Sequence, residues 1–575
     1  MKQLLPILKP YRWMAVAAAV LVFVQALAEI SLPTLMASIV DIGVVQGDTG
    51  HILKVGGVMV IVAASGMIAA FFGARLASLV AVGFARDLRN RLFAHISSFS
   101  LQEFDKVGTA TLITRTTNDV SQVQQLAFMS LRMMIRAPLM AIGGMIMALM
   151  QDVRLSLILF ACIPLLAAVI YAISSKGMPL FKAVQEKIDR LNLVTREALS
   201  GVRVIRAFNR TDYEEKRFDD ANRELTGTSI KVSRLMAAME PSTSLIFNFT
   251  IIAILWFGGV RIDQGELQVG RMMAFIQYAM QIMFSLMMVS MILVMVPRAA
   301  VSASRIGEVL ALQPEITDPD EPVTPAEENG IVEFDDVTFY YPGAEVPALQ
   351  NVSFTARPGE VTAIIGGIGS GKTTLAALLL RFYDVTQGSI RVDGVDIRQM
   401  SQKELRQRFA YVPQRAMLFT GTIAENLRYG KPDATDGEVR HAAESAQAAE
   451  FIERLDEGYD ALIAQGGTNF SGGQRQRLTI ARALVRRPKI YIFDDNFSAL
   501  DFKTDAKVRM ALQRETKDAT VIIVAQRVST IMDADQIIVL DQGKVVGIGT
   551  HRELLASCQI YREIVASQLA EEVIA

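Results

Sequence analysis

Six long apolar runs within about the first 300 of 575 residues restrict this half of the chain to membrane-spanning helices. A helix that crosses a bilayer needs about 20 mostly apolar residues, and lipid forces a segment to satisfy its own backbone hydrogen bonds. The composition agrees, because 51% of the residues are hydrophobic and only 20% are charged. The runs cover approximately residues 13–39, 55–80, 126–150, 155–175, 244–262 and 272–297.

The connections between the runs alternate in length and charge. Those at about 81–125 and 176–243 are long, charged and nearly free of Pro and Gly, which predicts helices that extend well beyond the membrane. Basic residues precede the first run at Lys2, Lys9 and Arg12, and cytosolic segments of membrane proteins carry such an excess. We therefore expect a cytosolic N-terminus and, after six crossings, a cytosolic C-terminus.

The rest of the chain predicts a soluble α/β domain. Residues 311–328 are rich in Pro and acidic side chains, as is typical of an exposed linker, so we divide the chain into 1–310, 311–328 and 329–575. The formal net charge of −1 argues against a nucleic-acid-binding surface. The two cysteines, Cys162 and Cys558, are too few for a disulfide framework or a cysteine metal cluster.

A phosphate-binding glycine loop lies in the soluble half. The segment GGIGSGKTT follows the apolar strand VTAII and opens a helical run, in agreement with the pattern G-x-x-x-x-G-K-[ST]. Backbone N–H groups of such a loop hold phosphates; Lys372 is expected to reach the β and γ oxygens of ATP, and Thr373 to bind Mg²⁺. The predicted loop consists of Gly366, Gly367, Ile368, Gly369, Ser370, Gly371, Lys372, Thr373 and Thr374.

Further motifs follow this loop in a fixed order. They are YVPQ, FSGGQRQRLTIARAL beginning at Phe470, the acidic strand KIYIFDD, SALD, and the later strand VIIVAQR. The order resembles that of ATP-binding-cassette (ABC) proteins, whose signature reads LSGGQ. Upstream, Glu103–Val120 and Arg196–Phe218 resemble the two intracellular loops of ABC exporters, which dock on the cassettes, so the resemblance covers nearly the whole chain.

The resemblance implies a fold and a set of roles. The fold is an α-helical membrane domain of six transmembrane helices with long cytosolic extensions, fused to an α/β P-loop cassette, which makes an exporter-type half-transporter. Tyr341 would stack on adenine, and Gln414 and Asp494 would join Thr373 around Mg²⁺. Asp501 would belong to the D-loop. The signature would close over the γ-phosphate held by the opposite subunit, and it consists of Ser471, Gly472, Gly473 and Gln474.

Two positions with a chemical role depart from the family pattern. Asp495 stands where a glutamate is expected, so its carboxylate lies about one bond length farther from the attacking water. A general base out of reach typically costs about 10²–10⁴ in rate. Gln526 replaces a histidine and cannot carry a positive charge. Gln465 also replaces a glutamate that often precedes the signature.

This pattern resembles the degenerate-site subunit of heterodimeric bacterial ABC exporters. We therefore expect a partner half-transporter that carries the consensus glutamate and histidine, to which this chain lends its signature. The predicted function is ATP-driven, Mg²⁺-dependent export of amphipathic or hydrophobic compounds, multidrug or lipid-like, across a bacterial plasma (inner) membrane. A slow homodimeric exporter and an ATP-gated regulatory or channel-like subunit are the alternatives.

The membrane half offers candidates for the cargo path. The sixth run is rich in methionine, whose flexible thioether suits a promiscuous apolar surface, although such residues also serve ordinary packing. Charges inside a membrane usually face a wet cavity or a partner, so Glu29 and the arginines of the third run either pair across helices or line the path. The candidates are Arg132, Arg136, Gln277, Met280, Gln281 and Met287.

Overall fold

The computed structural model describes residues 5–572, so Lys2 lies outside the described residues. The chain forms two compact units. One consists of Met1–Ser97 and Thr109–Leu312, and the other of Ser98–Gly108 and Gln313–Ala575. The segment Ser98–Gly108 therefore belongs to the second unit, although in the sequence it lies between the two parts of the first unit.

Within residues 5–572, six helices of the first unit are long and apolar enough to cross a membrane, which confirms the membrane half of the predicted fold class. They extend far beyond the apolar runs, as the charged connections predict. The long helices are α2 (Arg12–Ser38), α3 (Thr49–Ser97), α6 (Val120–Gln151), α7 (Val153–Ser200), α10 (Met239–Asp263) and α11 (Val269–Ala311). Shorter elements are α1 (Leu5–Leu8), η2 (Lys9–Tyr11), η3 (Ile39–Val44), α5 (Thr109–Thr114), η4 (Arg115–Asp119), α8 (Val202–Ala207) and α9 (Thr211–Ala237).

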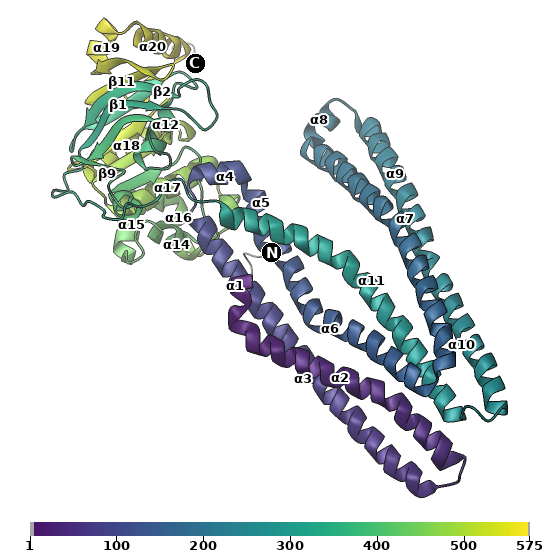
Figure 1. Ribbon diagram of the computed structural model, residues 1–575. Helices are drawn as coiled ribbons and strands as arrows, with labels where there is room; N and C mark the ends of the chain where they lie inside the picture. Colours follow the sequence, from purple (N-terminus) through teal and green to yellow (C-terminus); the bar gives the residue numbers. More distant parts are fainter. Residues whose placement is uncertain (1–4, 573–575) are drawn as a thin grey trace. The chain divides into compact units, whose positions relative to one another are not determined.

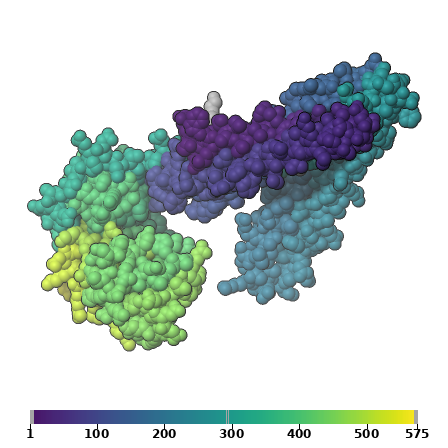
Figure 2. Space-filling view, turned by 90° about the horizontal axis from the view of Figure 1, so that it is seen from below, coloured from purple at the N-terminus to yellow at the C-terminus, as the bar shows by residue number. Residues whose placement is uncertain are grey.

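The long helices form two groups. Helix α6 packs along α11, and α2 packs against α3, whereas α7 pairs with α9 and α10. Toward α8, the second group diverges from α3, α6 and α11 (Figure 1), and it stands apart as the blue arm in Figure 2. At the tip of this arm, Val204 and Phe208 are 60% and 74% exposed, so the unit leaves an apolar tip uncovered.

A single residue turns the chain between α6 and α7. Asp152 has an extended backbone (φ −162°), and its carboxylate accepts a hydrogen bond from the backbone N–H of Leu155 at 2.8 Å. This is the N-cap interaction that satisfies an otherwise unpaired donor in the first turn of a helix. Arg261 of α10 donates to the same carboxylate at 2.6 Å. The turn is therefore fixed by one side chain that joins three long helices.

The second unit is built around two sheets. A six-stranded sheet has the order β12-β11-β3-β10-β9-β6, with only β12 antiparallel to its neighbour, and a four-stranded antiparallel sheet has the order β2-β1-β4-β5. The two sheets share a buried core of aliphatic and aromatic side chains. Strands β9 and β10 are buried along their whole length, as parallel strands covered on both faces are.

The strands of this unit are short and their bounds place the motifs. They are β1 (Val332–Phe339), β2 (Leu349–Ala356), β3 (Val361–Gly366), β4 (Gln387–Val392), β5 (Val395–Asp396), β6 (Phe409–Val412), β7 (Gly421–Thr422), β8 (Leu462–Ile463), β9 (Ile490–Asp494), β10 (Thr520–Val524), β11 (Gln536–Asp541) and β12 (Lys544–Gly549). Among the described residues, 312–331 form no helix or strand.

The helices of this unit lie between and beyond the strands. They are α4 (Leu101–Val107), α12 (Lys372–Leu379), α13 (Gln402–Gln407), α14 (Ile423–Arg428), α15 (Asp436–Ser445), α16 (Ala449–Ile452), η5 (Gly458–Asp460), η6 (Gln465–Gly467), α17 (Gly472–Arg486), η7 (Phe497–Ala499), α18 (Phe502–Glu515), η8 (Val528–Thr530), α19 (His551–Ser557) and α20 (Gln559–Glu572).

Helix α4 lies in the connection between α3 and α6 and belongs to the cassette unit. Glu103 closes a capping box with Ser100, and its other oxygen accepts from the backbone N–H of Glu315 at 3.2 Å. The Tyr383 hydroxyl donates to Asp105 at 3.0 Å. Because the chain enters and leaves α4 through the first unit, this small helix is tied to the cassette by side chains and to the membrane unit by covalent bonds.

Candidate nucleotide-binding site and membrane cavity

The predicted nucleotide residues meet at one edge of the six-stranded sheet. Strands β3, β10, β9 and β6 are parallel neighbours, so their carboxyl ends lie together. The glycine loop follows β3, Asp495 follows β9, Gln526 follows β10 and Gln414 follows β6. Crevices at the carboxyl ends of such strands are where α/β proteins bind ligands.

The glycine loop is shaped by close backbone contacts. A Cβ added to Gly366 would lie 2.1 Å from the backbone oxygen of Leu540, and Gly371 adopts φ +98° next to Leu349. Only glycine fits both positions at low cost. The Lys372 ammonium donates to the carbonyl oxygens of Gly366 and Gly367 at 2.9 and 2.7 Å. The loop is therefore curled around its own lysine at the N-terminus of α12.

Burial controls the charges at this edge. Desolvation lowers the pKa of Lys372, against the attraction of the two aspartates, and it raises the pKa of both Asp494 and Asp495. Asp494 is only 1% exposed, and its carboxylate accepts from the hydroxyls of Thr373 and Tyr411, at 3.3 Å each. Hard oxygen donors of this kind are the ligands that Mg²⁺ prefers, so Thr373 and Asp494 fit the predicted metal role.

Asp495 adopts a left-handed backbone conformation beyond the end of β9. Its φ is +49°, its backbone N–H donates to the carbonyl of Val524, and its carboxylate accepts from the Gln414 amide at 3.2 Å. The two residues expected near the reacting phosphate thus contact each other. Gln526 is exposed, and its backbone carbonyl oxygen accepts a hydrogen bond from the side-chain amide of Gln568 in α20 at 2.7 Å.

Tyr341 belongs to a cluster of three aromatic rings. Phe339 and Tyr383 approach it edge-on, with ring centroids 4.9 and 5.4 Å away, and the ring stays 38% exposed. Its hydroxyl lies 3.0 Å from that of Thr374 in the glycine loop. A partly exposed ring fixed beside the phosphate loop is suited to stacking on a base.

The signature forms the exposed N-terminus of α17. Ser471 and Gln474 make a capping box, with Ser471 N donating to Gln474 Oε1 at 2.8 Å and Ser471 Oγ accepting from Gln474 N at 3.3 Å. Free N–H groups and the helix dipole attract anions at such an end. Asp501 caps α18 by accepting from Thr504 N at 3.0 Å.

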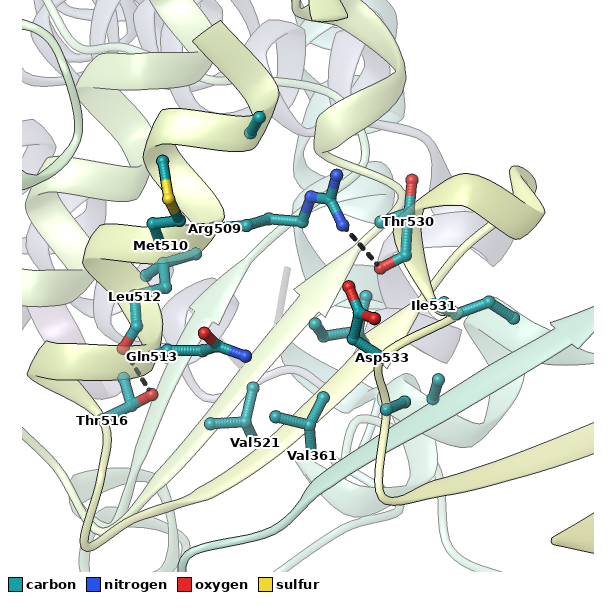
Figure 3. A pocket seen from close by; sticks show the side chains of 14 residues that line it. Val361, Arg509, Met510, Leu512, Gln513, Thr516, Val521, Thr530, Ile531 and Asp533 are labelled. Carbon is teal, nitrogen blue, oxygen red and sulfur yellow. Dashed lines mark hydrogen bonds between the residues drawn. The ribbon is translucent and has the colours of Figure 1, made fainter. Parts of the chain in front are cut away.

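A cavity of about 220 Å³ lies between α18 and the sheet, away from the glycine loop. Figure 3 shows Arg509 extending from α18 to the backbone of η8, where its guanidinium donates to the carbonyls of Ser529 and Thr530 at 3.1 and 3.5 Å. None of the predicted phosphate-binding residues lines this cavity. It separates the helix that follows Asp501 from the turn that follows Gln526.

A second cavity, of about 400 Å³, lies in the membrane unit between α2, α6 and α11. It brings together Arg136, Gln277, Met280 and Gln281 of the predicted cargo path, with Glu29 paired to Arg136. Two other candidates are not among its lining residues, namely Met287 and Arg132, whose guanidinium lies over the ring of Phe128. Their part in the path stays a prediction.

The sequence did not point to two tyrosines at these sites. Tyr411 holds Asp494, and Tyr383 contacts both Tyr341 and Asp105. Each stands beside a recognised motif, Tyr411 in YVPQ and Tyr383 after the helix that follows the glycine loop. The contact between Tyr383 and Asp105 spans 278 residues, and no local pattern encodes such a pair.

Comparisons with known proteins agree with these features. Residues 15–286 match the ABC transporter transmembrane region, and residues 349–498 match the ABC transporter model. An ABC transporter ATP-binding protein of Mycobacterium tuberculosis is 46% identical over 98% of this chain and 97% of its own length. An ATP-dependent lipid A-core flippase of Desulfotalea psychrophila is 36% identical over 82% of both chains.

A solved structure extends the likeness to three dimensions. The structure of a bacterial Atm1-family ABC exporter with ATP bound matches with a TM-score of 0.79 and 27% identity, covering 97% of this chain and 98% of that one. The cassette binds ATP and the whole chain is a multi-pass membrane translocase that hydrolyses it. With both halves matched and relatives aligned over nearly its full length, the chain belongs to the ABC transporter family, as a half-transporter of the exporter type.

Proposed function

We propose that this chain is the slowly hydrolysing subunit of a heterodimeric ABC exporter. The observation that carries the proposal is the site at the ends of β9 and β10, where Asp495 and Gln526 stand beside an otherwise complete phosphate loop. The glycine loop, the signature cap and the aromatic cluster around Tyr341 are all formed in this chain. Loss of function throughout the domain would be expected to damage these parts as well.

The side chains divide the work at the nucleotide. Tyr341 stacks on the base, Lys372 leaves its loop carbonyls for the β- and γ-phosphates, and Thr373 and Asp494 hold Mg²⁺. A magnesium ion there supplies charge neutralisation on the phosphates. Asp495 holds the attacking water only weakly, because its carboxylate is one methylene short and is engaged by Gln414.

The exposed signature explains why a second subunit is needed. Ser471 and Gln474 present the N-terminus of α17 to solvent, at the end of a 15-residue helix. The anion that this end attracts is the γ-phosphate bound by the partner, whose glutamate and histidine hydrolyse it. A homodimer of this chain would instead contain two slow sites. The experiment must distinguish this alternative from the heterodimer.

The proposed cargo is an amphipathic or hydrophobic compound, multidrug-like or lipid-like, moved outward across a bacterial plasma membrane. The methionine-rich helix α11 lines the cavity in the membrane unit, which supports an adaptable apolar path. The basic residues before α2 support a cytosolic N-terminus, and six crossings return the cassette to the side where ATP is.

Co-purification with a half-transporter encoded beside this chain, followed by ATPase assays, tests the proposal. We expect slow hydrolysis by this chain alone and fast hydrolysis by the mixed dimer. Neutralising the partner's glutamate should abolish the fast rate, whereas Asp495→Asn should change it little. Equally fast hydrolysis by this chain alone would contradict the heterodimer and favour the homodimer.

A further inference from the structure

The cavity between α2, α6 and α11 contains an ion pair that leaves it with almost no net charge. One guanidinium nitrogen of Arg136 (Nη2) donates to both oxygens of Glu29, at 2.7 and 2.9 Å. The two side chains are about 30% exposed, and both line the cavity. Glu29 lies on α2 and Arg136 on α6, so the ion pair links two different helices that line the cavity.

Both oxygens of the Glu29 carboxylate accept hydrogen bonds from neighbouring side chains. Glu29 Oε1 accepts from both Arg136 and Gln25 Nε2, the latter at 2.9 Å, and Oε2 accepts from Arg136. The Gln281 amide donates to the backbone oxygen of Glu29 at 3.3 Å, which fixes it against the same turn of α2. Glu29 is therefore satisfied by its neighbours and does not need a cationic ligand.

Two hydrogen-bonding atoms at the pair have no partner among the described residues, one of them a nitrogen of the guanidinium itself. Within the part of the chain that the structure describes, Arg136 Nε and Gln281 Oε1 are buried without a hydrogen-bond partner. Buried donors and acceptors are rarely left unpaired, and each costs free energy until it is satisfied. The exposed side chain of Gln277 adds both a donor and an acceptor to the lining of the same cavity.

Most of the other side chains that line the cavity are apolar. Met280 and Phe284 are 44% and 62% exposed, and Met140 and Met288 also face the space. Thioethers adapt to irregular apolar shapes, so these side chains do not select a ligand of one shape. The cavity thus combines adaptable apolar side chains with a charge-paired Glu29 and Arg136 and with the exposed amide of Gln277, which can both donate and accept hydrogen bonds.

We propose that this cavity selects net-neutral amphiphiles whose polar part carries both a hydrogen-bond donor and an acceptor, such as a zwitterion, and discriminates against anions and cations. An anion would have to take Arg136 from Glu29 and leave a carboxylate without a cation, and a cation would do the reverse. Removing one partner of a partly buried pair is costly. The inference rests on the proposed export function, whose cargo class it narrows.

Three xanthene dyes of nearly the same shape test this charge selection. Rhodamine 110 is net-neutral, with amino donors and a carboxylate; rhodamine 123 is its cationic methyl ester; fluorescein is the anionic analogue with oxygens in place of the nitrogens. Binding is measured without ATP, by fluorescence polarisation with the full-length transporter in nanodiscs. We expect rhodamine 110 to bind at least ten-fold more tightly than either charged dye.

Variants of the pair should change the selection in opposite directions. Glu29→Gln leaves Arg136 uncompensated, so fluorescein affinity should rise at least ten-fold, whereas Arg136→Gln should favour rhodamine 123. The double exchange Glu29→Arg with Arg136→Glu restores a pair, so we expect the wild-type preference to return. This variant decides the test if the single variants fold poorly. Glu240→Gln, an exposed carboxylate of α10 outside the cavity, is the matched control and should change nothing.

The result that overturns the inference is charge-independent binding. Equal affinity for all three dyes, or a fluorescein affinity unchanged in Glu29→Gln, would show that the pair does not select the ligand. ATP-driven accumulation of rhodamine 110 in inside-out vesicles reports separately on export. Selective binding without accumulation would contradict the export function, and accumulation without selectivity would contradict only this inference.

Discussion

Replacing Asp495 by glutamate should restore a hydrolytic site in this chain. The change adds one methylene, about 1.5 Å of reach, to a carboxylate that the Gln414 amide holds at 3.2 Å beside the phosphate loop. A general base contributes about 10²–10⁴ in rate, which corresponds to about 3–5 kcal/mol of activation free energy. Asp495 keeps part of that contribution, so we expect Asp495→Glu to raise ATP hydrolysis about ten- to hundred-fold.

The backbone sets the cost of this change. Asp495 has φ +49°, and short polar residues tolerate the left-handed region better than glutamate does. We therefore expect a loss of about 1 kcal/mol in the free energy of unfolding, together with the faster turnover. A variant that gains activity while losing a little stability separates a repaired active site from a general stabilisation of the cassette.

Phosphate release by the purified full-length chain in nanodiscs measures the effect. Asp495→Asn is the matched control, and it should reduce hydrolysis further while leaving ATP binding intact. Adding Gln526→His to Asp495→Glu should raise the rate again, because histidine can carry a positive charge toward the γ-phosphate. If Asp495→Glu and Asp495→Asn both hydrolyse ATP at the wild-type rate, Asp495 does not limit catalysis and the reasoning is wrong.

Three further predictions concern α4, the signature and pH. Tyr383→Phe removes one hydrogen bond to α4, worth about 0.5–1.5 kcal/mol, so hydrogen exchange in that helix should quicken about two- to ten-fold with ATP affinity unchanged. Ser471→Ala and the control Ser401→Ala each remove an N-cap and should cost about 1 kcal/mol of stability, but only Ser471→Ala should slow hydrolysis by the dimer. The hydrogen bond from Lys431 lowers the pKa of Glu438 to about 2. The ionised Glu438 therefore stabilises the folded protein above pH 4.5, and this stabilisation is lost as the pH falls toward 2. The difference in Tm between the wild type and Glu438→Gln should disappear over that pH range.

Local patterns predicted most of the fold because both halves are governed by local rules. Twenty apolar residues in lipid must form a helix, so the spans and their charged extensions followed from composition alone. The cassette motifs lie at strand ends, and parallel pairing of β3, β10, β9 and β6 necessarily gathers them at one edge. That Thr373 and Asp494 lie close together was expected from the resemblance to ABC proteins.

Contacts between distant segments were beyond this reasoning. Helical periodicity shows which face of a helix carries a charge, but not which neighbour it meets. Glu29 and Arg136 lie 107 residues apart, and the sequence left open whether they pair or line the cargo path; they pair and line a cavity, and their part in the path stays a prediction. The grouping of Ser98–Gly108 with the cassette depends on hydrogen bonds from Tyr383 and Glu315, which lie more than 200 residues away in the chain.

In the proposed site, nucleotide binding and hydrolysis use different side chains, so one activity can weaken while the other persists. Tyr341 packs against Tyr383, and Tyr383 donates to Asp105 of α4, whose two ends continue into the membrane unit. This route from Tyr341, which we propose to stack on the base, to the membrane helices does not pass through Asp495 or Gln526. A subunit that hydrolyses slowly would therefore still respond to ATP binding, which gives a physical reason to retain the binding groups after the catalytic ones have changed.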